Sequence, residues 1–217
     1  MKNRVITISR EFGSGGRTIG REAARLLNIP CYDQEILQRL AEESGFSEAY
    51  VKEQGEYAPY SGWLNALAGR SNGLTNQDQL WVLQRRLILE LAEKGPCVIV
   101  GRCADYILRD SADCLTAFIH ADIAQRAKRI VEVYGQREEA PEKRLRDKDK
   151  RRASYYQFYT DSSTRTWPGA TPGMFTSRWT AAPWGSSGAR TFWSVCSDFR
   201  NISEKYAIIP LINQKRM

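Results

Sequence analysis

Short apolar runs alternate along the chain with longer segments of helical periodicity. Val5–Ile8 is a β-branched run before a glycine-rich turn, and a helical pattern through Leu27 follows it. Two further apolar runs, Cys97–Val100 and Leu115–Ile119, have the length and composition of strands buried on both faces. This alternation predicts an α/β fold built on a doubly wound parallel sheet.

Other elements follow from periodicity and from start and stop signals. One short strand and three helices are predicted: Ile29–Tyr32, Gln34–Glu43, a helix capped by Ser47, and Gln77–Lys94. The last of these has leucines at helical spacing and ends at Gly95-Pro96. The strand ends, at Asp33 and Gly101-Arg102, would lie at the carboxyl edge of the sheet, where open α/β sheets bind ligands.

Two segments lack the pattern of a buried element. Residues 54–76 contain Gly, Pro, Tyr and Trp without a sustained period. We interpret them as a mobile insert that either closes on a substrate or is plain surface irregularity. Charges crowd together from Arg137 to Arg152, which is typical either of a solvated helix or of a lid whose basic side chains close over a polyphosphate. We place this lid at residues 136–157.

The turn Gly13-Ser14-Gly15-Gly16, followed by Arg17-Thr18, carries a clear chemical signal. Glycines let backbone N–H groups curl around phosphate oxygens, and the next helix presents its positive dipole end to the same anion. The segment can be aligned with the G-x-x-x-x-G-K-[ST] motif in two registers, and both lack the lysine. Arg17 stands at the lysine position in one register and Gly16 in the other. The guanidinium group of arginine is planar and forked, whereas the lysine ammonium is a point charge, so arginine would bind phosphate with a different geometry. The simpler alternative is a glycine-rich strand-to-helix turn.

Composition narrows the classes of protein. A chain of 217 residues can form one domain with a full core, and nothing in it resembles a signal peptide or a membrane span, so we expect a cytoplasmic protein. Five cysteines without C-x-x-C spacing indicate reduced thiols. The single histidine, His120, excludes a His-rich metal site, and we interpret it as structural or substrate-adjacent.

The net charge of +7 is concentrated at one end of the sequence. Residues 162–217 hold seven of the 32 basic residues and two of the 25 acidic residues, which places +5 of the charge there. Residues 1–161 are nearly balanced, so we expect neither a nucleic-acid partner nor a membrane partner. The sequence leaves the oligomeric state open.

Five segments together resemble the cytidylate kinase-like family, relatives of the nucleoside monophosphate kinases: ITISREFGSGGRTIG, IPCYDQEIL, GPCVIVGRCADYILRD, FIHADIAQRAKRI and DKDKRRASYYQFYT. They extend from about Val5 to Thr160. The resemblance implies a three-layer P-loop NTPase fold with a helical lid. It also implies ATP as phosphoryl donor, Mg²⁺ bridging the ATP phosphates, and a pyrimidine nucleoside monophosphate (CMP-like) or a similar small acceptor.

The resemblance further implies roles for individual residues. The donor-binding set would be Gly13, Ser14, Gly15, Gly16, Arg17 and Thr18, with Arg126 on the nucleotide side. Thr18 would supply the hydroxyl on the Mg²⁺ side, and the acceptor would meet Asp33 and Arg102. The lid would contribute the D-x-x-R pair Asp149 and Arg152, so the catalytic set becomes Arg17, Asp149 and Arg152. No general base is required, since phosphoryl transfer depends on positioning and electrostatics.

The chain changes character after Asp161. Four of the six tryptophans lie in the next segment, SSTRTWPGATPGMFTSRWTAAPWGSSGARTFWSVCSDF. This segment shows neither the helical nor the strand period, although a kinase of this type would have its last strand and closing helix here. If each codon is reread from the last base of the codon before it, every Trp becomes Leu, Met or Val, and a plausible strand, HVHISV, can be read. We therefore interpret residues 162–217 as translated out of frame, and expect the sheet to lack an element beyond the kinase-like domain of residues 1–161.

Two other functions remain open. The missing lysine favours a regulatory protein that binds nucleotide without kinase turnover. A genuine tryptophan-rich tail would instead favour a partner-binding module.

Overall fold

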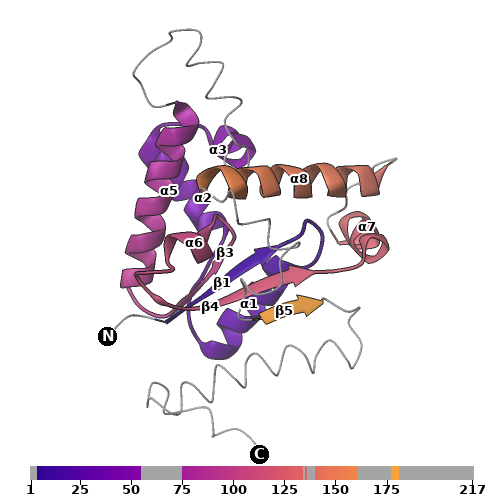
Figure 1. Ribbon diagram of the computed structural model, residues 1–217, viewed down its shortest axis with the longest axis horizontal. Coiled ribbons are helices and arrows are strands. Elements are labelled where there is room, and N and C mark those ends of the chain that lie inside the picture. Colours follow the sequence, from indigo (N-terminus) through magenta and orange to yellow (C-terminus); the bar gives the residue numbers. More distant parts are fainter. Residues whose placement is uncertain (1–3, 55–74, 134, 136–139, 161–176, 181–217) are drawn as a thin grey trace, which may run out of the picture.

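One parallel sheet forms the centre of the computed structural model, which describes residues 4–54, 75–133, 135, 140–160 and 177–180. Its strands are β1 (Arg4–Arg10), β2 (Cys31–Tyr32), β3 (Cys97–Val100), β4 (Asp113–His120) and β5 (Ser177–Thr180), in the order β2-β3-β1-β4-β5 (Figure 1). All the paired strands run parallel. The chain therefore reaches β2 and β3 on one side of β1 before it crosses to β4 on the other.

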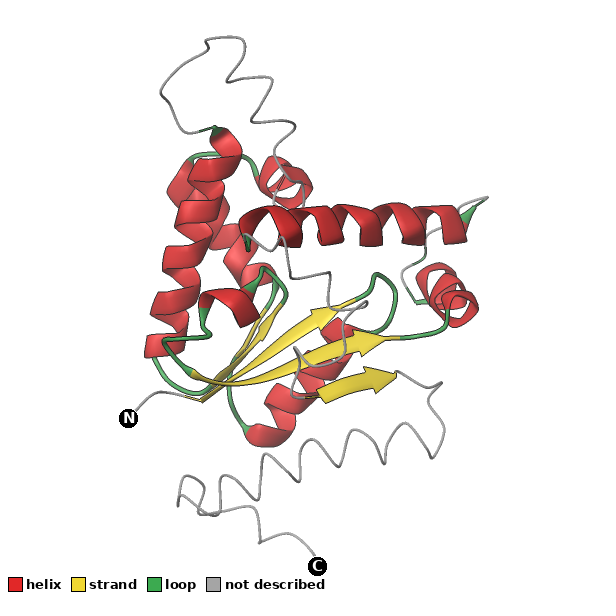
Figure 2. Ribbon diagram, viewed as in Figure 1, coloured by secondary structure: helices red, strands yellow, loops and turns green. Residues whose placement is uncertain are grey.

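Helices cover both faces of this sheet (Figure 2). One face carries α1 (Gly16–Leu27), and the other carries α2 (Gln34–Ser44), α3 (Glu48–Gln54), α5 (Asn76–Glu93) and α6 (Ala104–Ile107). Successive strand residues point to opposite faces, so Val5 packs with α2 and α5 whereas Ile6 packs with α1. The predicted three-layer α/β fold with a parallel sheet is confirmed.

Local sequence signals account for the ends of these helices. The Thr75 hydroxyl accepts a hydrogen bond from the backbone of Asp78, and the Asp78 carboxylate accepts one from the Thr75 N–H, which is a capping box at the start of α5. The Ser47 hydroxyl likewise accepts from the Tyr50 N–H at the start of α3. The helices predicted at Gln34–Glu43 and Gln77–Lys94 match α2 and α5 to within one residue at each end. Most of the predicted insert, residues 55–74, lies outside the described residues.

The charged segment forms α8 (Pro141–Tyr159), which follows α7 (Ile123–Glu132). Proline is tolerated in the first turn of a helix, where its missing N–H has no intrahelical partner. Leu145, Tyr155 and Tyr156 of α8 are buried, so this helix packs on the domain and is not solvated on all sides. Residues 136–139 of the predicted lid lie outside the described residues.

The edge of the sheet differs from the expectation that its last strand is missing. β5 pairs in parallel with β4, from Ala117 beside Ser177 to His120 beside Thr180. Strand pairing uses backbone N–H and C=O groups, which a segment supplies whatever its side chains are. Part of the tryptophan-rich segment therefore occupies the place of the fifth strand.

The described cysteines, Cys31, Cys97, Cys103 and Cys114, are free thiols, as predicted, and Cys196 lies outside the described residues. Burial raises the pKa of Cys31 to about 11 and that of Cys97 to about 12. Such thiols are poor nucleophiles at neutral pH, so these two residues pack as small apolar groups. His120 ends β4, as predicted from the sequence.

Candidate active site

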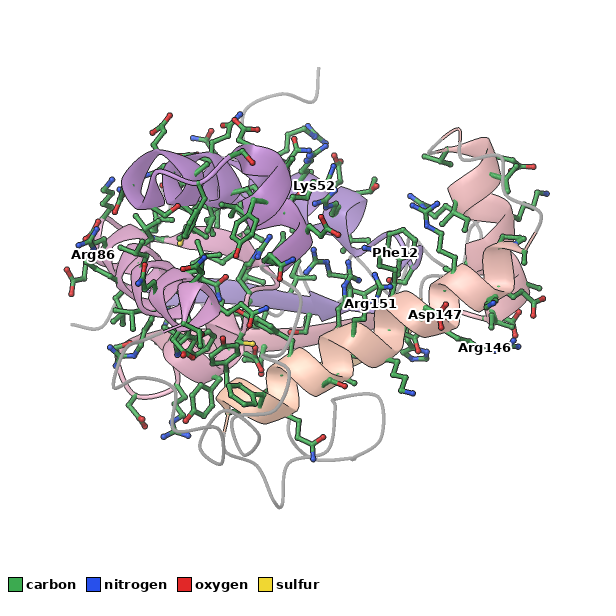
Figure 3. The ribbon with its side chains drawn as sticks, turned by 90° about the horizontal axis from the view of Figure 1, so that it is seen from above. Phe12, Lys52, Arg86, Arg146, Asp147 and Arg151 are labelled. Atoms are coloured by element: carbon green, nitrogen blue, oxygen red, sulfur yellow. The ribbon has the colours of Figure 1, made fainter. Side chains whose placement is uncertain are left out.

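The carboxyl ends of β1, β2 and β3 bring three predicted segments to one edge of the sheet. β1 is followed by the glycine loop (residues 11–16), β2 by Asp33, and β3 by Gly101-Arg102. Because the three strands are parallel neighbours, their ends meet at the same edge. Figure 3 shows this edge from above, with Phe12 of the glycine loop beside α8.

The glycine loop has the backbone conformation that its sequence predicts. Gly13 and Gly15 have φ values of 79° and 88°, which favour glycine, and Gly15 is the N-cap of α1. The Ser14 side chain is buried, and its hydroxyl donates to the Glu11 carbonyl at 3.0 Å. α1 begins without a side-chain cap and without an acidic residue in its first turn. These are the features of a helix N-terminus that can bind an anion, so the loop residues fit a phosphate group.

Asp33 lies among arginines from two elements. Its carboxylate is 2.9 Å from Arg17 Nε, 3.7 Å from Arg21 Nη2 and 4.0 Å from Arg10 Nη2, although its own side chain is only 6% exposed. A buried carboxylate requires such partners because of its desolvation. Arg17, which the sequence assigns to the donor phosphates, is therefore directed to Asp33 in the structure.

The loop after β3 adds a strained backbone to the same edge. Gly101, Arg102 and Cys103 are three consecutive residues with positive φ, at 78°, 60° and 53°. Such conformations persist in non-glycine residues only where neighbours hold them. Here the Gly101 N–H donates a hydrogen bond to the Ile8 carbonyl, and the Gln84 side-chain amide donates one to the Arg102 carbonyl at 3.1 Å. Arg102 is a site residue predicted from the sequence, whereas its strained backbone conformation is not predicted.

Arg10 passes between the glycine loop and the β3 loop. A Cβ on Gly16 would lie 2.7 Å from Arg10 Cβ, and one on Gly101 would meet the end of the Arg10 guanidinium. Gly16 is therefore needed to admit the Arg10 side chain, and Gly101 is favoured by its own φ of 78°. Neither Arg10 nor Arg21 is among the site residues predicted from the sequence, although the position of Arg10 at the end of β1 is a signal that could have identified it.

Arg126 and Asp149, both predicted site residues, meet across the glycine loop. Arg126 donates to Asp149 Oδ2 at 2.6 Å and to the Phe12 carbonyl at 3.1 Å. Asp149 in turn accepts from the Phe12 N–H at 2.7 Å. Glu11 joins this set, at 3.5 Å from Arg126 Nε. The set binds the loop to α7 and α8, so the structure places both residues in contact with the loop backbone.

Further arginines of α8 surround the Phe12 ring. Arg144 Cζ and Arg152 Cζ lie 5.9 Å and 5.5 Å from the ring centroid, within cation–π range. Arg152 also donates to the Arg10 carbonyl at 3.3 Å. The predicted lid residue Arg152 is thus held at the end of β1, beside the loop.

Thr18, the predicted Mg²⁺-side residue, accepts a hydrogen bond from Arg129 Nη2 at 3.2 Å. The same guanidinium lies 3.1–3.4 Å from the position that a Cβ on Gly15 would occupy. Arg129 is not among the site residues predicted from the sequence. A signal was present, because Arg126 and Arg129 are three residues apart and share one helix face.

A buried polar network lies beneath this edge. Asp105 accepts from Tyr156 Oη at 2.8 Å, and Gln84 donates to Tyr155 Oη at 3.2 Å. Burial raises the pKa of the Asp105 carboxyl, against the opposing effect of hydrogen bonds from Tyr156 and Ser9. The network connects the C-terminal half of α8 to α5, α6 and β1.

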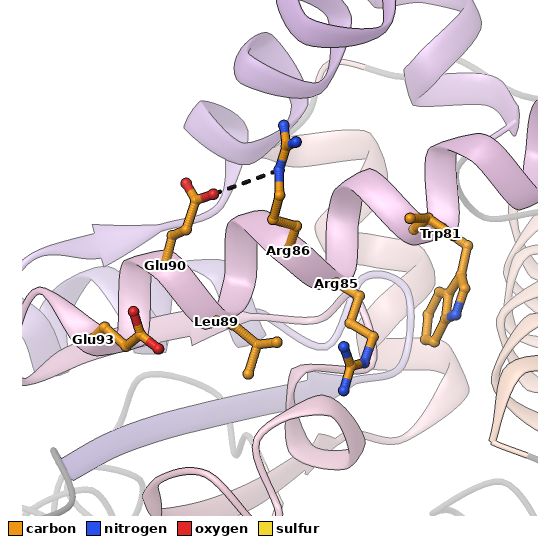
Figure 4. A pocket seen from close by; sticks show the side chains of 7 residues that line it. Trp81, Arg85, Arg86, Leu89, Glu90 and Glu93 are labelled. Carbon is orange, nitrogen blue, oxygen red and sulfur yellow. Dashed lines mark ion pairs between the residues drawn. The ribbon is translucent and has the colours of Figure 1, made fainter.

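A separate hollow of about 420 Å³ follows the outer surface of α5 (Figure 4). Its lining includes Trp81, Arg85 and Leu89, together with the ion pair between Arg86 Nε and Glu90 at 3.5 Å. None of the predicted site residues lines this hollow, so it is distinct from the carboxyl edge. Over the described ranges, no three His, Cys, Asp or Glu side chains are grouped as a metal site, and no helix is long and apolar enough to cross a membrane.

Solved structures share this fold at low sequence identity. An uncharacterized protein from Eubacterium ventriosum matches with a TM-score of 0.61 and 24% identity, over 92% of this chain and 98% of that chain. Shikimate kinase from Bacteroides thetaiotaomicron matches with a TM-score of 0.51 and 15% identity, over 92% and 98% of the two chains. A gluconokinase from Sinorhizobium meliloti gives 0.51 and 17%, over 94% and 97%. The fold is that of P-loop kinases.

A search of curated proteins gave no significant match. A family model, described as the cytidylate kinase-like family, matches residues 5–168. This match includes the glycine loop, Asp33, the β3 loop and α8, and it ends close to the change of character after Asp161. The chain therefore belongs to the cytidylate kinase-like family.

Proposed function

We propose that this protein transfers the γ-phosphoryl group of Mg²⁺-ATP to a small anionic acceptor, with a pyrimidine nucleoside monophosphate, CMP-like, as the first candidate. Family membership and the P-loop kinase fold support a phosphotransfer kinase role. One observation carries the proposal: the glycine loop and the Asp33–arginine cluster lie side by side at one edge of the sheet.

The donor side of the proposed site is the glycine loop. The backbone of Gly13–Gly16 and the start of α1 would bind the donor phosphates, and the Thr18 hydroxyl is a hard oxygen of the type that Mg²⁺ accepts. Mg²⁺-ATP supplies the phosphoryl group and the positive charge that bridges its phosphates. The proposed role of Arg126 and Asp149 is to hold the loop backbone at Phe12 in this conformation.

The acceptor side is the cluster around Asp33. Arginines bind phosphate or carboxylate through paired N–H groups, whereas Asp33 accepts hydrogen bonds from hydroxyl or amino groups. An acceptor that carries both an anionic group and hydroxyls therefore suits Arg10, Arg21 and Asp33 better than a neutral one does. Arg102 at the end of β3 is proposed to contribute to the same acceptor site.

Transfer itself needs positioning and charge more than covalent chemistry. Arg152 of α8 lies beside the loop and is proposed to stabilise charge that develops on the transferred group. The contact of Arg17 with the donor phosphates stays a prediction, since its guanidinium pairs with Asp33 in the structure.

The test is an ADP-release assay of the full chain with Mg²⁺-ATP and a panel of acceptors. CMP, dCMP, UMP, AMP and GMP would be compared with shikimate, which has a carboxylate but no phosphate. The proposal expects turnover with at least one monophosphate, and comparison with shikimate distinguishes a phosphate-bearing acceptor from a carboxylate-bearing one. Tight ATP binding without ADP release across the panel would overturn it in favour of the regulatory alternative, which the missing lysine favours.

A further inference from the structure

Among the arginines near the glycine loop, two form close ion pairs with carboxylates. Arg17 pairs with Asp33 at 2.9 Å, and Arg126 pairs with Asp149 at 2.6 Å. An arginine engaged in a close ion pair has less charge to offer a phosphate group. In the structure, both guanidinium groups therefore make their closest polar contacts within the chain.

Arg129 is different. Its guanidinium lies against Gly15 and donates to Thr18 Oγ1, while its buried Nε has no hydrogen-bond partner among the described residues. Within the part of the chain that the structure describes, no carboxylate lies within ion-pair distance of Arg129. A partly buried cation is thus positioned at the N-terminus of α1, where the helix dipole is also positive. Two positive groups at one place are unfavourable alone and complementary to an anion.

We propose that Arg129 supplies, from α7, the positive charge that a lysine in the glycine loop would otherwise supply to the donor phosphates. This inference rests on the proposed function and deepens it. A phosphate oxygen near Gly15 would accept from the Arg129 guanidinium in place of the Thr18 hydroxyl. Thr18 Oγ1 would then be available to Mg²⁺. Glycine at position 15 suits this arrangement because its φ of 88° favours glycine and because a Cβ there would make a tight contact, 3.1 Å, with Arg129 Cζ.

The surroundings of α7 support this role. Ile130 Cγ2 lies 3.0 Å from the position that a Cβ on Gly13 would occupy, so α7 packs directly on the loop. Arg126, nearly one turn before Arg129, donates to the Phe12 carbonyl. These contacts fix the distance between α7 and the loop, which places Arg129 where a planar, permanently charged fork can bind phosphate through two N–H groups.

The inference is tested by calorimetric titration of the full chain with Mg²⁺-ADP and, separately, with inorganic tripolyphosphate. Arg129→Gln should weaken binding of both by on the order of ten- to a hundredfold, the range expected for lost charge-assisted hydrogen bonds. Arg129→Lys should recover part of the loss. Arg17→Gln should weaken both much less than Arg129→Gln does. Lys128→Gln removes an equal charge from an exposed neighbour that pairs with Glu132, and it should bind as the wild type does.

The outcomes separate the inference from the proposed function. Equal binding by wild type and Arg129→Gln, with loss in Arg17→Gln, would overturn the inference and leave the kinase proposal intact. Loss in Arg129→Gln with no turnover on any acceptor would support the inference and overturn the kinase proposal. Absence of binding by the wild type would overturn both. If Arg129→Gln melts at a lower temperature than the wild type, the Arg129→Lys variant provides the test. Failure of Arg129→Lys to recover any of the lost binding would then overturn the inference.

Discussion

Asp33 and Asp105 are both buried carboxyl groups, but they have different neighbours. Asp33 lies among Arg10, Arg17 and Arg21, whereas Asp105 is held by neutral hydroxyl groups, including that of Tyr156. Burial disfavours the ionised form of a carboxyl group, and nearby cations or hydrogen-bond donors oppose that effect. The pKa of Asp105 is raised because burial outweighs its hydrogen bonds.

This raised pKa predicts a pH-dependent stability. The folded chain binds the Asp105 proton more tightly than the unfolded chain, whose pKa is near 3.8. The contribution of Asp105 to stability is therefore full below the unfolded pKa and is lost as the pH rises through the folded pKa. An Asp105→Asn variant lacks this proton, so its free energy of unfolding relative to the wild type should rise as the pH increases above the unfolded pKa. Urea denaturation at several pH values measures this difference, and a constant difference would contradict the prediction.

Asp33 belongs to the proposed acceptor site, so its loss should act on the acceptor. In an Asp33→Asn variant, kcat/KM for the acceptor should fall by on the order of tenfold or more, with little change in KM for ATP. Steady-state kinetics with each substrate varied in turn gives the two values. Asp110→Asn, which removes an exposed carboxylate that pairs with Arg109, is the matched control. A larger effect on KM for ATP than on the acceptor would place Asp33 on the donor side.

At the scale of elements, α8 is bound to the domain at two places. Asp149 contacts the glycine loop, and Tyr155 and Tyr156 contact the network of Gln84 and Asp105. Trp81 of α5 also stacks on Tyr159, with ring centroids 4.3 Å apart. The hydrophilic sequence of this helix is therefore compatible with a fixed position, because a few long-range contacts are enough to hold it.

The position of Arg152 on α8 predicts a specific kinetic effect. Arg152→Ala should lower kcat by about a hundredfold, because its charge is proposed to act on the group in transfer. The affinity for ATP should change much less, as measured by equilibrium titration. Arg146→Ala is the control on the same helix, since its exposed pair with Glu142 is expected to contribute little. Equal losses in turnover and affinity for Arg152→Ala would mean that α8 serves binding only.

At the scale of the whole molecule, β5 is the edge strand on one side of the sheet. The alternative reading frame places its predicted strand HVHISV at positions 174–179, which overlaps β5 (Ser177–Thr180). The strand that pairs with β4 in the structure and the strand predicted in the alternative reading frame therefore fall at overlapping positions of the chain. The out-of-frame interpretation itself remains a prediction, and resequencing the gene across the codons for Thr160 to Ser163 tests it.

Deletion of residues 162–217 should impair folding, because it removes β5 and leaves the backbone of β4 unpaired along one edge. Circular dichroism and thermal melting of the shortened chain would show loss of a cooperative transition. A shortened chain that melts as the full chain does, and still binds Mg²⁺-ADP, would contradict this prediction. Loss of partner binding alone would favour the interaction-module alternative.

Local patterns predicted much of the fold. The β-branched run in β1, the apolar run in β3 and the leucine spacing in α5 identify buried elements because burial follows the period of each element. The positive φ of Gly13 and Gly15 was likewise implied by the glycine-rich turn. The strained Arg102 and the β5 pairing did not follow from the pattern, since both depend on neighbours that are distant in sequence.

The sequence by itself determined the strand–loop–helix unit, the alternation of strands and helices, and the membership of a kinase-like family. Only the tertiary structure decided which charges meet. Phe12 and Asp149 are 137 residues apart, and Thr18 and Arg129 are 111 residues apart. Periodicity determines which face of an element is buried, but it carries no information about the residue opposite. Arg17 therefore pairs with Asp33, and Arg129 lies over Gly15, because packing places α7 and the end of β2 beside the loop.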